Sequence, residues 1–279
     1  MKKLMINQYQ AILIVLMLLT CFKTNAQQKI LKIPLNAGKT YLKVTVIKSE
    51  SHLQNGQVKI NISSAATVSK TYKIEAGTGG LFDVTVVTNK ITNSIASGND
   101  QFYFDSDSVV NSKSVLATAI ASTVGKPYVF QIDSGGAIAS VKTDYPKAAI
   151  DTVFGFTGLE QEDLSVGKKF PLIADIRSLK NLKIGEKWSD PALTANGETV
   201  TEFWIQSRAE TVTTIAFSKT ITNLGLNTQS TGTYVVDNIT GVIMQRKVQN
   251  FTTGYQTLKN TSYVSSRSST ITENCSVVN

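Results

Sequence analysis

The sequence has only one histidine and two cysteines among its 279 residues. A zinc site needs three or four closely placed histidine, cysteine or carboxylate ligands, so the chain cannot supply a histidine–cysteine set. Nucleophilic catalysis by serine needs a base, and the one histidine, His52, lies in a polar stretch that we interpret as a surface loop. A Gly-x-Ser-x-Gly turn is also missing. We therefore expect no catalytic residues, no metal site, no cofactor and no enzyme.

The acidic residues suggest little further chemistry. Glycoside hydrolysis needs two carboxylates on opposite sides of a cleft, whereas the clusters at residues 160–163 (which include Glu162) and 198–202 are close in sequence and expected to face solvent. A calcium loop at residues 99–108 would lack the glycine and the distal glutamate of an EF-hand. We interpret it as a polar turn after a strand, and the glycine-rich residues 77–80 as a hairpin turn.

The longest apolar run lies near the N-terminus, at residues 11–22, and has only 12 residues. Spanning a ~30 Å hydrocarbon core needs about 20 apolar residues, so this run does not predict a transmembrane helix. Two lysines precede the run and small residues follow it, which is the pattern of a signal peptide at residues 1–26. We expect cleavage after Ala26 and export of residues 27–279 to the periplasm or the extracellular space, with no transmembrane span in the mature chain.

A second interpretation places the cleavage before Cys21, because residues 18–21 are similar to a lipobox. The product would then be lipid-anchored through Cys21. Thr20 departs from the glycine, alanine or serine usual at that place, so we favour the cut after Ala26. That cut leaves Cys275 unable to form an internal disulfide, and we interpret it as an incidental thiol in a polar tail.

The chain carries only a mild excess of positive charge. The chain carries 28 lysines and arginines against 20 acidic residues, a formal net charge of +8, and loss of the three lysines in residues 1–26 would lower it to 8 − 3 = +5. No block of basic residues resembles a nucleic-acid-binding arm, so nucleic acid is not an expected partner. Single lysines recur along the predicted strands, where we expect them on solvent faces and edges; they are Lys39, Lys43, Lys48, Lys59, Lys70 and Lys73.

Only five prolines interrupt the chain, and apolar periodicity of helical length is rare. Apolar and polar residues instead alternate with a period of two at residues 41–47, 58–63, 82–87 and 200–206. In the first of these runs the alternation puts Leu42, Val44 and Val46 together as an apolar face. Such patterns are typical of half-buried strands in antiparallel sheets. We expect a mainly β protein built on a large curved antiparallel sheet, as a half-barrel or a sandwich.

Two segments have helical character. Residues 112–123 carry an apolar stripe at helical spacing, and residues 146–154 begin with a proline suited to a first helical turn. We expect both to be short helices packed on the sheet as lids. Residues 159–182 are less regular and are predicted to be a connector with one strand at 169–173.

Two patterns repeat along the chain. Residues 128–141 and 234–246 each contain a strand, an aspartate, a glycine-containing turn and a returning strand, which is typical of a hairpin. A glycine followed three residues later by an aromatic residue is interpreted as a turn followed by a strand whose first inward residue is aromatic; it occurs at Gly38, Gly125, Gly167 and Gly185. These repeats predict two similar β halves, about residues 29–142 and 167–273, in one continuous curved sheet or in two domains.

Six stretches carry a resemblance to a known group of proteins: Gly-Lys-Thr-Tyr-Leu-Lys-Val at 38–44, Phe-Tyr-Phe-Asp-Ser-Asp at 102–107, Val-Gly-Lys-Pro-Tyr at 124–128, the hairpin at 133–141, Ile-Gly-Glu-Lys-Trp at 184–188 and the hairpin at 232–242. The chain resembles an uncharacterised family of secreted or lipid-anchored β-rich envelope proteins of Bacteroidota. The family implies no activity and no functional residues. The aspartate hairpin is also similar to one in periplasmic lipoprotein carriers, whose curved sheet holds acyl chains under helical lids.

Two functions from different classes follow. In the first, the protein binds an apolar or lipid-like small molecule on the concave face of the sheet, with residues 112–123 as part of a lid. Its ligand-binding residues would then point inward around a cavity; they are Phe82, Val115, Leu116, Ile120, Phe203 and Ile205. In the second, the protein is a non-catalytic structural or interaction component of the envelope, with a filled core, a surface apolar patch and an envelope protein as partner.

Overall fold

The computed structural model describes residues 37–108, 114–143, 159, 162–174, 181–194, 197–223, 225–258 and 261–278. These residues belong to one compact unit, Lys32–Asn279. The expected signal peptide at residues 1–26 and the expected helix at residues 146–154 lie outside the described residues.

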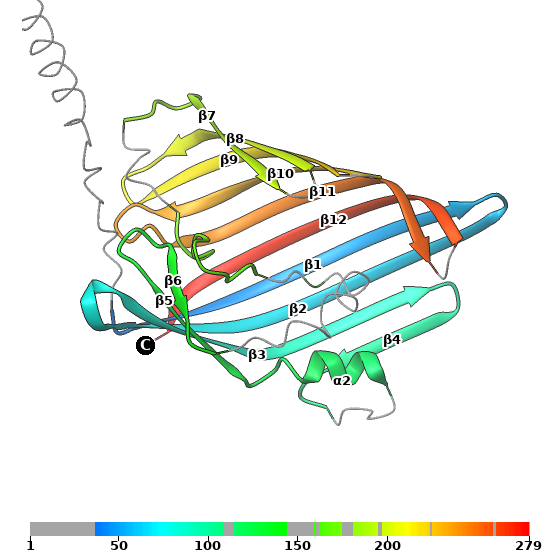
Figure 1. The fold of residues 1–279 in the computed structure, drawn as a ribbon, viewed down its shortest axis with the longest axis horizontal. Helices are drawn as coiled ribbons and strands as arrows, with labels where there is room; N and C mark the ends of the chain where they lie inside the picture. The colour runs from blue at the N-terminus through cyan, green and yellow to red at the C-terminus, as the bar shows by residue number, and fades with distance from the viewer. Residues whose placement is uncertain are drawn as a thin grey trace, which may run out of the picture. The chain divides into compact units, whose positions relative to one another are not determined.

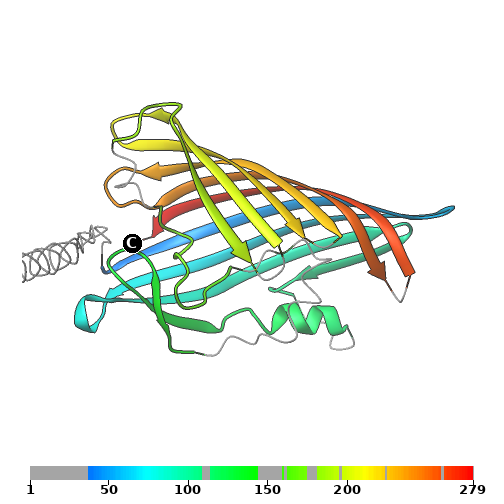
Figure 2. The same cartoon turned by 45° about the horizontal axis from the view of Figure 1, so that its top comes forward.

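The described residues form a single large antiparallel sheet (Figure 1). Its twelve strands are β1 (Lys39–Asn55), β2 (Val58–Ala76), β3 (Phe82–Ser97), β4 (Asp100–Asp105), β5 (Pro127–Ile132), β6 (Ile138–Val141), β7 (Lys187–Thr194), β8 (Gly197–Arg208), β9 (Val212–Asn223), β10 (Leu226–Asp237), β11 (Ile243–Leu258) and β12 (Thr261–Val278). The strand order is β6-β5-β3-β2-β1-β12-β11-β10-β9-β8-β7, and β4 pairs with β3. The sheet is curved and open, as Figure 2 shows from a second side.

The first and last strands meet in the middle of this sheet. β1 pairs with β12 from Thr40 opposite Val278 to Gln54 opposite Val264. On one side of the β1–β12 pair, the strands of the first half of the chain follow as far as β6 at one edge of the sheet. On the other side, the strands of the second half run from β7 at the opposite edge to β12 in the middle. The prediction of a mainly β protein with a large curved antiparallel sheet is therefore confirmed, in the form of one continuous sheet. The similarity of the two halves stays a prediction.

One helix, α2 (Val115–Ala121), packs on the sheet. The Ser114 side chain accepts a hydrogen bond from the Ala117 amide and so caps the first turn. Ala117 and Ile120 are buried against β2, β3 and β4 in a cluster that also contains Ala66, Val68, Ile91 and Phe104. The predicted short helix within residues 112–123 is thus confirmed, and its apolar stripe anchors it to one side of the sheet (Figure 1).

The predicted turns have the expected chemistry. Asp133 Oδ1 accepts hydrogen bonds from the amides of Gly135 and Ala137, and Asp237 Oδ1 accepts them from Ile239 and Thr240. All four glycines of the glycine–aromatic pattern have positive φ, between 73° and 87°, which disfavours any side chain. Of the aromatic residues that follow them, three are buried in the core, namely Tyr41, Tyr128 and Phe170, and Trp188 is partly buried against a core cluster.

The buried side of β1 differs from the prediction. The residues that face the core are Tyr41, Lys43, Thr45 and Ile47, whereas Leu42, Val44 and Val46 are only partly buried. We call this buried side, which faces α2 and residues 162–174, the inner face of the sheet. The expectation that Lys43 and Lys70 face solvent is therefore wrong: Lys43 is 5% exposed, and the Lys70 side chain is 17% exposed.

Three further interpretations need correction. His52 lies within β1, not in a loop, and its Nδ1 is 2.8 Å from Asn61 Oδ1 on β2. Cys275 lies on the inner face of β12 and is buried, not in a polar tail. Residues 169–173 do not form a strand, because Lys169 and Ile173 make only isolated bridges with neighbouring turns.

Candidate functional site

The inner face is organised in rows that cross the strands. Because directly paired residues lie side by side on the same face, the register places Phe217, Gly232, Val248, Ile271 and Ile47 in one line from β9 to β1. We call these five residues the apolar row. A second line lies two residues further along each strand, and we call it the polar row; it consists of Lys219, Ser230, Asn250, Ser269 and Ser49.

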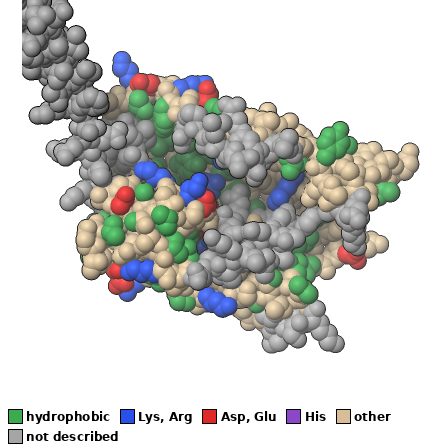
Figure 3. Space-filling model, in the orientation of Figure 1, with side chains coloured by type: hydrophobic (Ala, Val, Ile, Leu, Met, Phe, Trp, Pro, Cys, Tyr) green, Lys and Arg blue, Asp and Glu red, His purple; other side chains and the backbone are tan. Residues whose placement is uncertain are grey.

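A cavity of about 450 Å³ lies over these two rows. This volume falls in the range of small-molecule sites, roughly 300–1,000 Å³. The described residues that line it all come from the inner face of β1 and β9–β12, together with Leu159; they are Ile47, Leu159, Phe217, Lys219, Ile221, Thr228, Ser230, Tyr234, Arg246, Val248, Asn250, Thr252, Arg267, Ser269 and Ile271. Figure 3 shows hydrophobic side chains gathered in a hollow of this face, with lysine or arginine side chains beside them.

An aromatic layer forms part of the cavity floor. The Phe217 ring lies against Gly232 so closely that a Cβ on Gly232 would come within 2.7 Å of the ring and 2.2 Å of the Lys247 carbonyl oxygen. Phe217 also stacks on Tyr234, with ring centroids 5.0 Å apart. Glycine at position 232 therefore lets the ring pack onto the backbone of β10 and keeps the space above it open.

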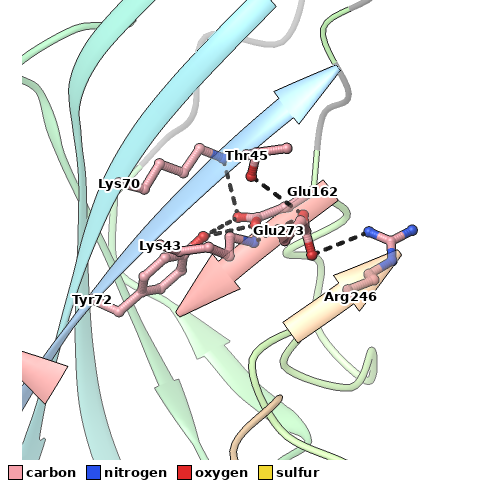
Figure 4. Close-up of polar contacts among 7 residues, drawn as sticks. All are labelled: Lys43, Thr45, Lys70, Tyr72, Glu162, Arg246 and Glu273. Atoms are coloured by element: carbon pink, nitrogen blue, oxygen red, sulfur yellow. Dashed lines mark hydrogen bonds and ion pairs between the residues drawn. The ribbon is translucent and has the colours of Figure 1, made fainter. Parts of the chain in front are cut away.

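Beside the cavity, the inner face buries a cluster of charged groups (Figure 4). Glu162 is at its centre. Its carboxylate forms ion pairs with Lys43 and with Lys70, the latter at 3.2 Å, and accepts hydrogen bonds of 2.7 and 2.9 Å from the Tyr72 hydroxyl. Lys43 also lies over the Tyr72 ring, 5.3 Å from its centroid. Each buried charge thus has partners, which buried charges require.

A second carboxylate, Glu273 on β12, extends the cluster toward the cavity. It lies 3.6 Å from Lys43 Nζ, 3.5 Å from Arg246 Nη1 and 3.4 Å from the Thr45 hydroxyl. Arg246 is shared by the two sites, because it also lines the cavity. The charges therefore alternate along the cluster, from Lys70 on β2 through Glu162, Lys43 and Glu273 to Arg246 on β11.

The pKa values of the cluster follow from these contacts. Burial alone would raise the pKa of Glu162, but the charges of Lys70 and Lys43 and the hydrogen bonds from Lys43 and Tyr72 hold it well below the usual 4.5. Burial alone would lower the pKa of Lys43, yet Glu162 and Glu273 raise it above 10.5. Both groups are charged at neutral pH.

Acid should weaken the fold through Glu162. Its pKa is lowered in the folded state, so its stabilising contribution is complete above the unfolded pKa of about 4.5 and is lost as the pH falls below that value. We expect the urea midpoint of the wild type to decrease on acidification below about pH 4.5. The Glu162→Gln variant should show a shallower decrease over the same range, and parallel curves would contradict this assignment.

Glu162 belongs to a segment, residues 162–174, that we call the strap. The Ile138 amide donates to Lys168 O and the Phe170 amide to Gly136 O, both at 2.8 Å, which joins the strap to the β5–β6 hairpin. At its other end, the Ala174 amide donates to Gly241 O at 2.8 Å in the β10–β11 turn. The strap thus connects the two aspartate hairpins, and Phe170 and Leu172 pack in the largest core cluster.

The six residues predicted to bind a ligand are not brought together. Ile120 and Ile205 are buried, at 1% and 0% exposure, in different clusters. Leu116, Phe82 and Phe203 are partly buried at the edges of clusters. Val115 is 81% exposed, so its predicted inward position is wrong; it lies in the first turn of a seven-residue helix whose other side meets the sheet. None of the six is among the described residues that line the cavity.

Sequence reasoning missed Lys43, Lys70, Glu162 and the cations of the cavity. Glu162 was expected to face solvent because it lies in an acidic, irregular stretch. One local signal could have indicated that the lysines are buried. Lys43 is two residues from Tyr41, and Lys70 is two residues from Tyr72, so each lysine lies on the same face of its strand as a large aromatic residue. Lys70 and Lys43 lie 92 and 119 residues from Glu162 in the sequence, so their pairing could not be read locally.

A second hollow, of about 680 Å³, lies mainly on the outer face of β1–β4 and β12. Its lining mixes serines such as Ser63, Ser94 and Ser268 with the apolar or aromatic residues Ile95, Phe102 and Tyr103. Because most of its lining residues lie on the outer face, this hollow is separate from the apolar row. Near it, Asp105 and Asp107 form ion pairs with Lys90, in the polar turn predicted after β4.

Among the described residues, no group of three or more histidine, cysteine or acidic side chains is arranged to hold a metal ion. Within the same part of the chain, no helix has the length and apolar character needed to cross a membrane.

Comparisons with known proteins give no family. No protein-family model and no curated protein matches the chain. Among solved structures, the chain is similar to a lipovitellin structure described for its lipid–protein interactions, with 11% identity and a TM-score of 0.49, over 87% of this chain and 26% of that one. The chain therefore spans about a quarter of that lipovitellin chain.

Two bacterial structures are also similar. One is an outer membrane channel from Pseudomonas putida F1, at 8% identity and a TM-score of 0.29, over 88% of this chain and 98% of that one. The other is the translocator domain of the autotransporter NalP from Neisseria meningitidis, at 7% identity and a TM-score of 0.23, over 87% and 90% of the two chains. With TM-scores below 0.5, none of these likenesses supports a functional statement about this chain.

Proposed function

We propose that the protein is a non-enzymatic, exported cell-envelope protein that binds an apolar or lipid-like ligand in the inner-face cavity. The observation that carries this proposal is a 450 Å³ cavity whose floor is the apolar row. Export is inferred from the signal-peptide pattern at residues 1–26. The resemblance to envelope proteins of Bacteroidota is consistent with that location and remains a prediction.

The chemistry of the cavity supports a small ligand more than a macromolecule. Phe217, Val248 and Ile271 are each at most 4% exposed, so the floor is continuous with the packed core. Eight of the fifteen described lining residues carry polar or charged side chains, and two of them, Asn250 and Ser269, hydrogen bond to each other at 3.2 Å. Small-molecule sites combine apolar surface with placed polar groups, and this cavity has both.

Native mass spectrometry of the purified protein tests this proposal. We expect a fraction of molecules to carry a bound species that organic solvent extracts, and we expect the extracted protein to take up added decanol. Ile221→Trp or Thr252→Trp, each placing an indole at the cavity rim, should abolish uptake while circular dichroism stays unchanged. A wild-type protein that carries no ligand and takes up none would reject the proposal.

A second function, docking of an envelope protein, has one observation in its favour. Phe251, Tyr255 and Val264 are 52%, 66% and 58% exposed, and Tyr255 is directly opposite Val264 on the outer face of β11 and β12. Exposed apolar side chains that gather in this way often mark contact surfaces. Replacing Phe251 and Tyr255 by serine should reduce capture of a cross-linked envelope partner and leave decanol uptake unchanged. Equal cross-linking by both proteins would argue against docking at this surface.

A further inference from the structure

The hollow of about 680 Å³ on the outer face is separate from the inner-face cavity, and its lining has a regular layout. Outward-facing residues of five neighbouring strands line it in two adjacent rows. The first row runs from β4 to β12; it consists of Tyr103, Ser94, Ala65, Lys48 and Thr270. The second row lies two residues away along each strand and runs from Gln101 to Ser268. We propose that this hollow binds a neutral oligosaccharide, which lies across the strands from β4 toward β12.

The shape of the hollow suits a chain of sugar rings. Neighbouring strands lie about 4.8 Å apart, so the two rows extend about 19 Å from β4 to β12. The rows themselves are separated by about 7 Å, the distance between residues two apart on a strand. On β2 and β3, both rows contain only serine and alanine, so long side chains do not fill this part of the hollow. A long and narrow hollow holds an extended chain of sugar rings better than a compact molecule.

Tyr103 provides an aromatic surface at the β4 end of the hollow, where it is 70% exposed. Its hydroxyl interacts with the carboxylate of Asp105, two residues further along the same strand. The Asp107 amide, Lys90 and this hydroxyl together hold the pKa of Asp105 below 3.8. The tyrosine is therefore fixed at its hydroxyl end, while its ring remains open to a ligand. The apolar face of a sugar packs well on such a ring, which adds contact area at little cost in conformational entropy.

The polar groups of the lining match the hydroxyl groups of a sugar, which both donate and accept hydrogen bonds. The serine and threonine hydroxyls and the Gln101 amide also do both, whereas Lys48 only donates and ionised Glu50 only accepts. Within the part of the chain that the structure describes, neither Lys48 nor Glu50 forms an ion pair or a side-chain hydrogen bond. Both side chains are therefore available to a ligand.

The balance of charge favours a neutral ligand. Among the described lining residues, Lys48 is the only cation and Glu50 the only carboxylate, so their formal charges cancel. A site with one charge of each sign does not concentrate anions or cations around it. The two side chains instead offer charge-assisted hydrogen bonds, which are stronger than those between neutral groups. A neutral oligosaccharide can use both of them, whereas an acidic or a basic one is repelled by one of the two.

Titration calorimetry of the purified protein with oligosaccharides of six sugar units tests the inference. The neutral probes are cellohexaose, maltohexaose, mannohexaose and chitohexaose, and the charged probes are hexagalacturonate and the chitosan hexamer. We expect at least one neutral probe to bind, and to bind more tightly than either charged probe. The disaccharide of the same sugar should bind more weakly, because it covers only part of the hollow. Absence of binding by all four neutral probes, or tighter binding of a charged one, would overturn the inference.

Variants locate the site. Tyr103→Ala should weaken binding of the best neutral probe by about tenfold, the loss expected from one aromatic contact. Tyr255→Ala is the matched control, because Tyr255 is 66% exposed on the same face of the sheet but does not line the hollow. Ala65→Trp adds a bulky side chain at an exposed position of the hollow, and it should abolish binding while the circular dichroism spectrum stays unchanged.

The outcome for sugars is separate from the outcome for the inner-face cavity. Equal losses in Tyr103→Ala and Tyr255→Ala, or unchanged binding by Ala65→Trp, would overturn the inference. Both Tyr103→Ala and Ala65→Trp should take up decanol as the wild type does, because the inner-face cavity is lined from the opposite face of the sheet. Sugar binding and decanol uptake can therefore fail independently of each other.

Discussion

Replacing Glu162 by glutamine should lower the free energy of unfolding by about 3–5 kcal/mol, the cost typical of breaking a buried ion pair from one side. The substitution keeps the shape of the side chain but leaves Lys43 and Lys70 without their shared carboxylate. Among the described residues, Lys43 would keep Glu273, at 3.6 Å, as its ion-pair partner. Chemical denaturation measures the loss directly, and the melting temperature should fall by roughly 10 °C.

Glu202→Gln is the matched control for this prediction. Glu202 pairs with Lys187 at 3.3 Å, but both side chains are about half exposed, so solvent screens the pair. Surface pairs of this kind contribute about 0–1 kcal/mol, and we expect a change within that range. If Glu162→Gln lowered the free energy of unfolding by no more than Glu202→Gln does, the buried cluster would not stabilise the fold as described.

Replacing Gly232 by alanine should be the second most damaging single change. Its Cβ would lie 2.2 Å from the Lys247 carbonyl oxygen, a backbone atom that cannot move without disturbing the pairing of β10 with β11. It would also meet the Phe217 ring at 2.7 Å and push the ring into the cavity. Overpacking of this kind commonly costs up to about 3 kcal/mol, and we expect a loss near that value.

Thr231→Ala provides the comparison, because Thr231 is the exposed neighbour on the same strand. Alanine there should change the unfolding free energy by less than about 1 kcal/mol, the span of strand propensities. Gly232→Ala should also weaken decanol uptake, whereas Thr231→Ala should not. Equal stability of the two variants would show that β10 tolerates a side chain at position 232, contrary to the described packing.

Much of the fold was accessible from local patterns. The period-two alternation predicted the strands, the aspartate and glycine turns predicted the hairpins, and the aromatic residues after Gly38 and Gly125 were correctly expected to point inward. These features are local, since a turn and the strand next to it depend on neighbouring residues. One helix was also correct, because a short apolar stripe at helical spacing can only be buried by packing on the sheet.

The candidate site was not accessible in the same way. The buried face of β1 carries Lys43 and Thr45, and hydrophobicity alone favours the opposite face with Leu42 and Val44. The preference reverses because Glu162 and Glu273 arrive from distant parts of the chain and compensate the lysine charge. The cavity likewise depends on the register of five strands, which a single sequence does not specify.

The central claim, that the inner-face cavity holds the apolar chain of a ligand, is tested most directly by crystallography with 12-bromododecanoate. The bromine marks the chain end through its anomalous scattering. The account predicts a bromine peak over the apolar row, in contact with Val248 or Ile271, and the carboxylate at the polar rim of the cavity. A bromine peak on the outer face, or the carboxylate over the apolar row with the chain in solvent, would contradict it.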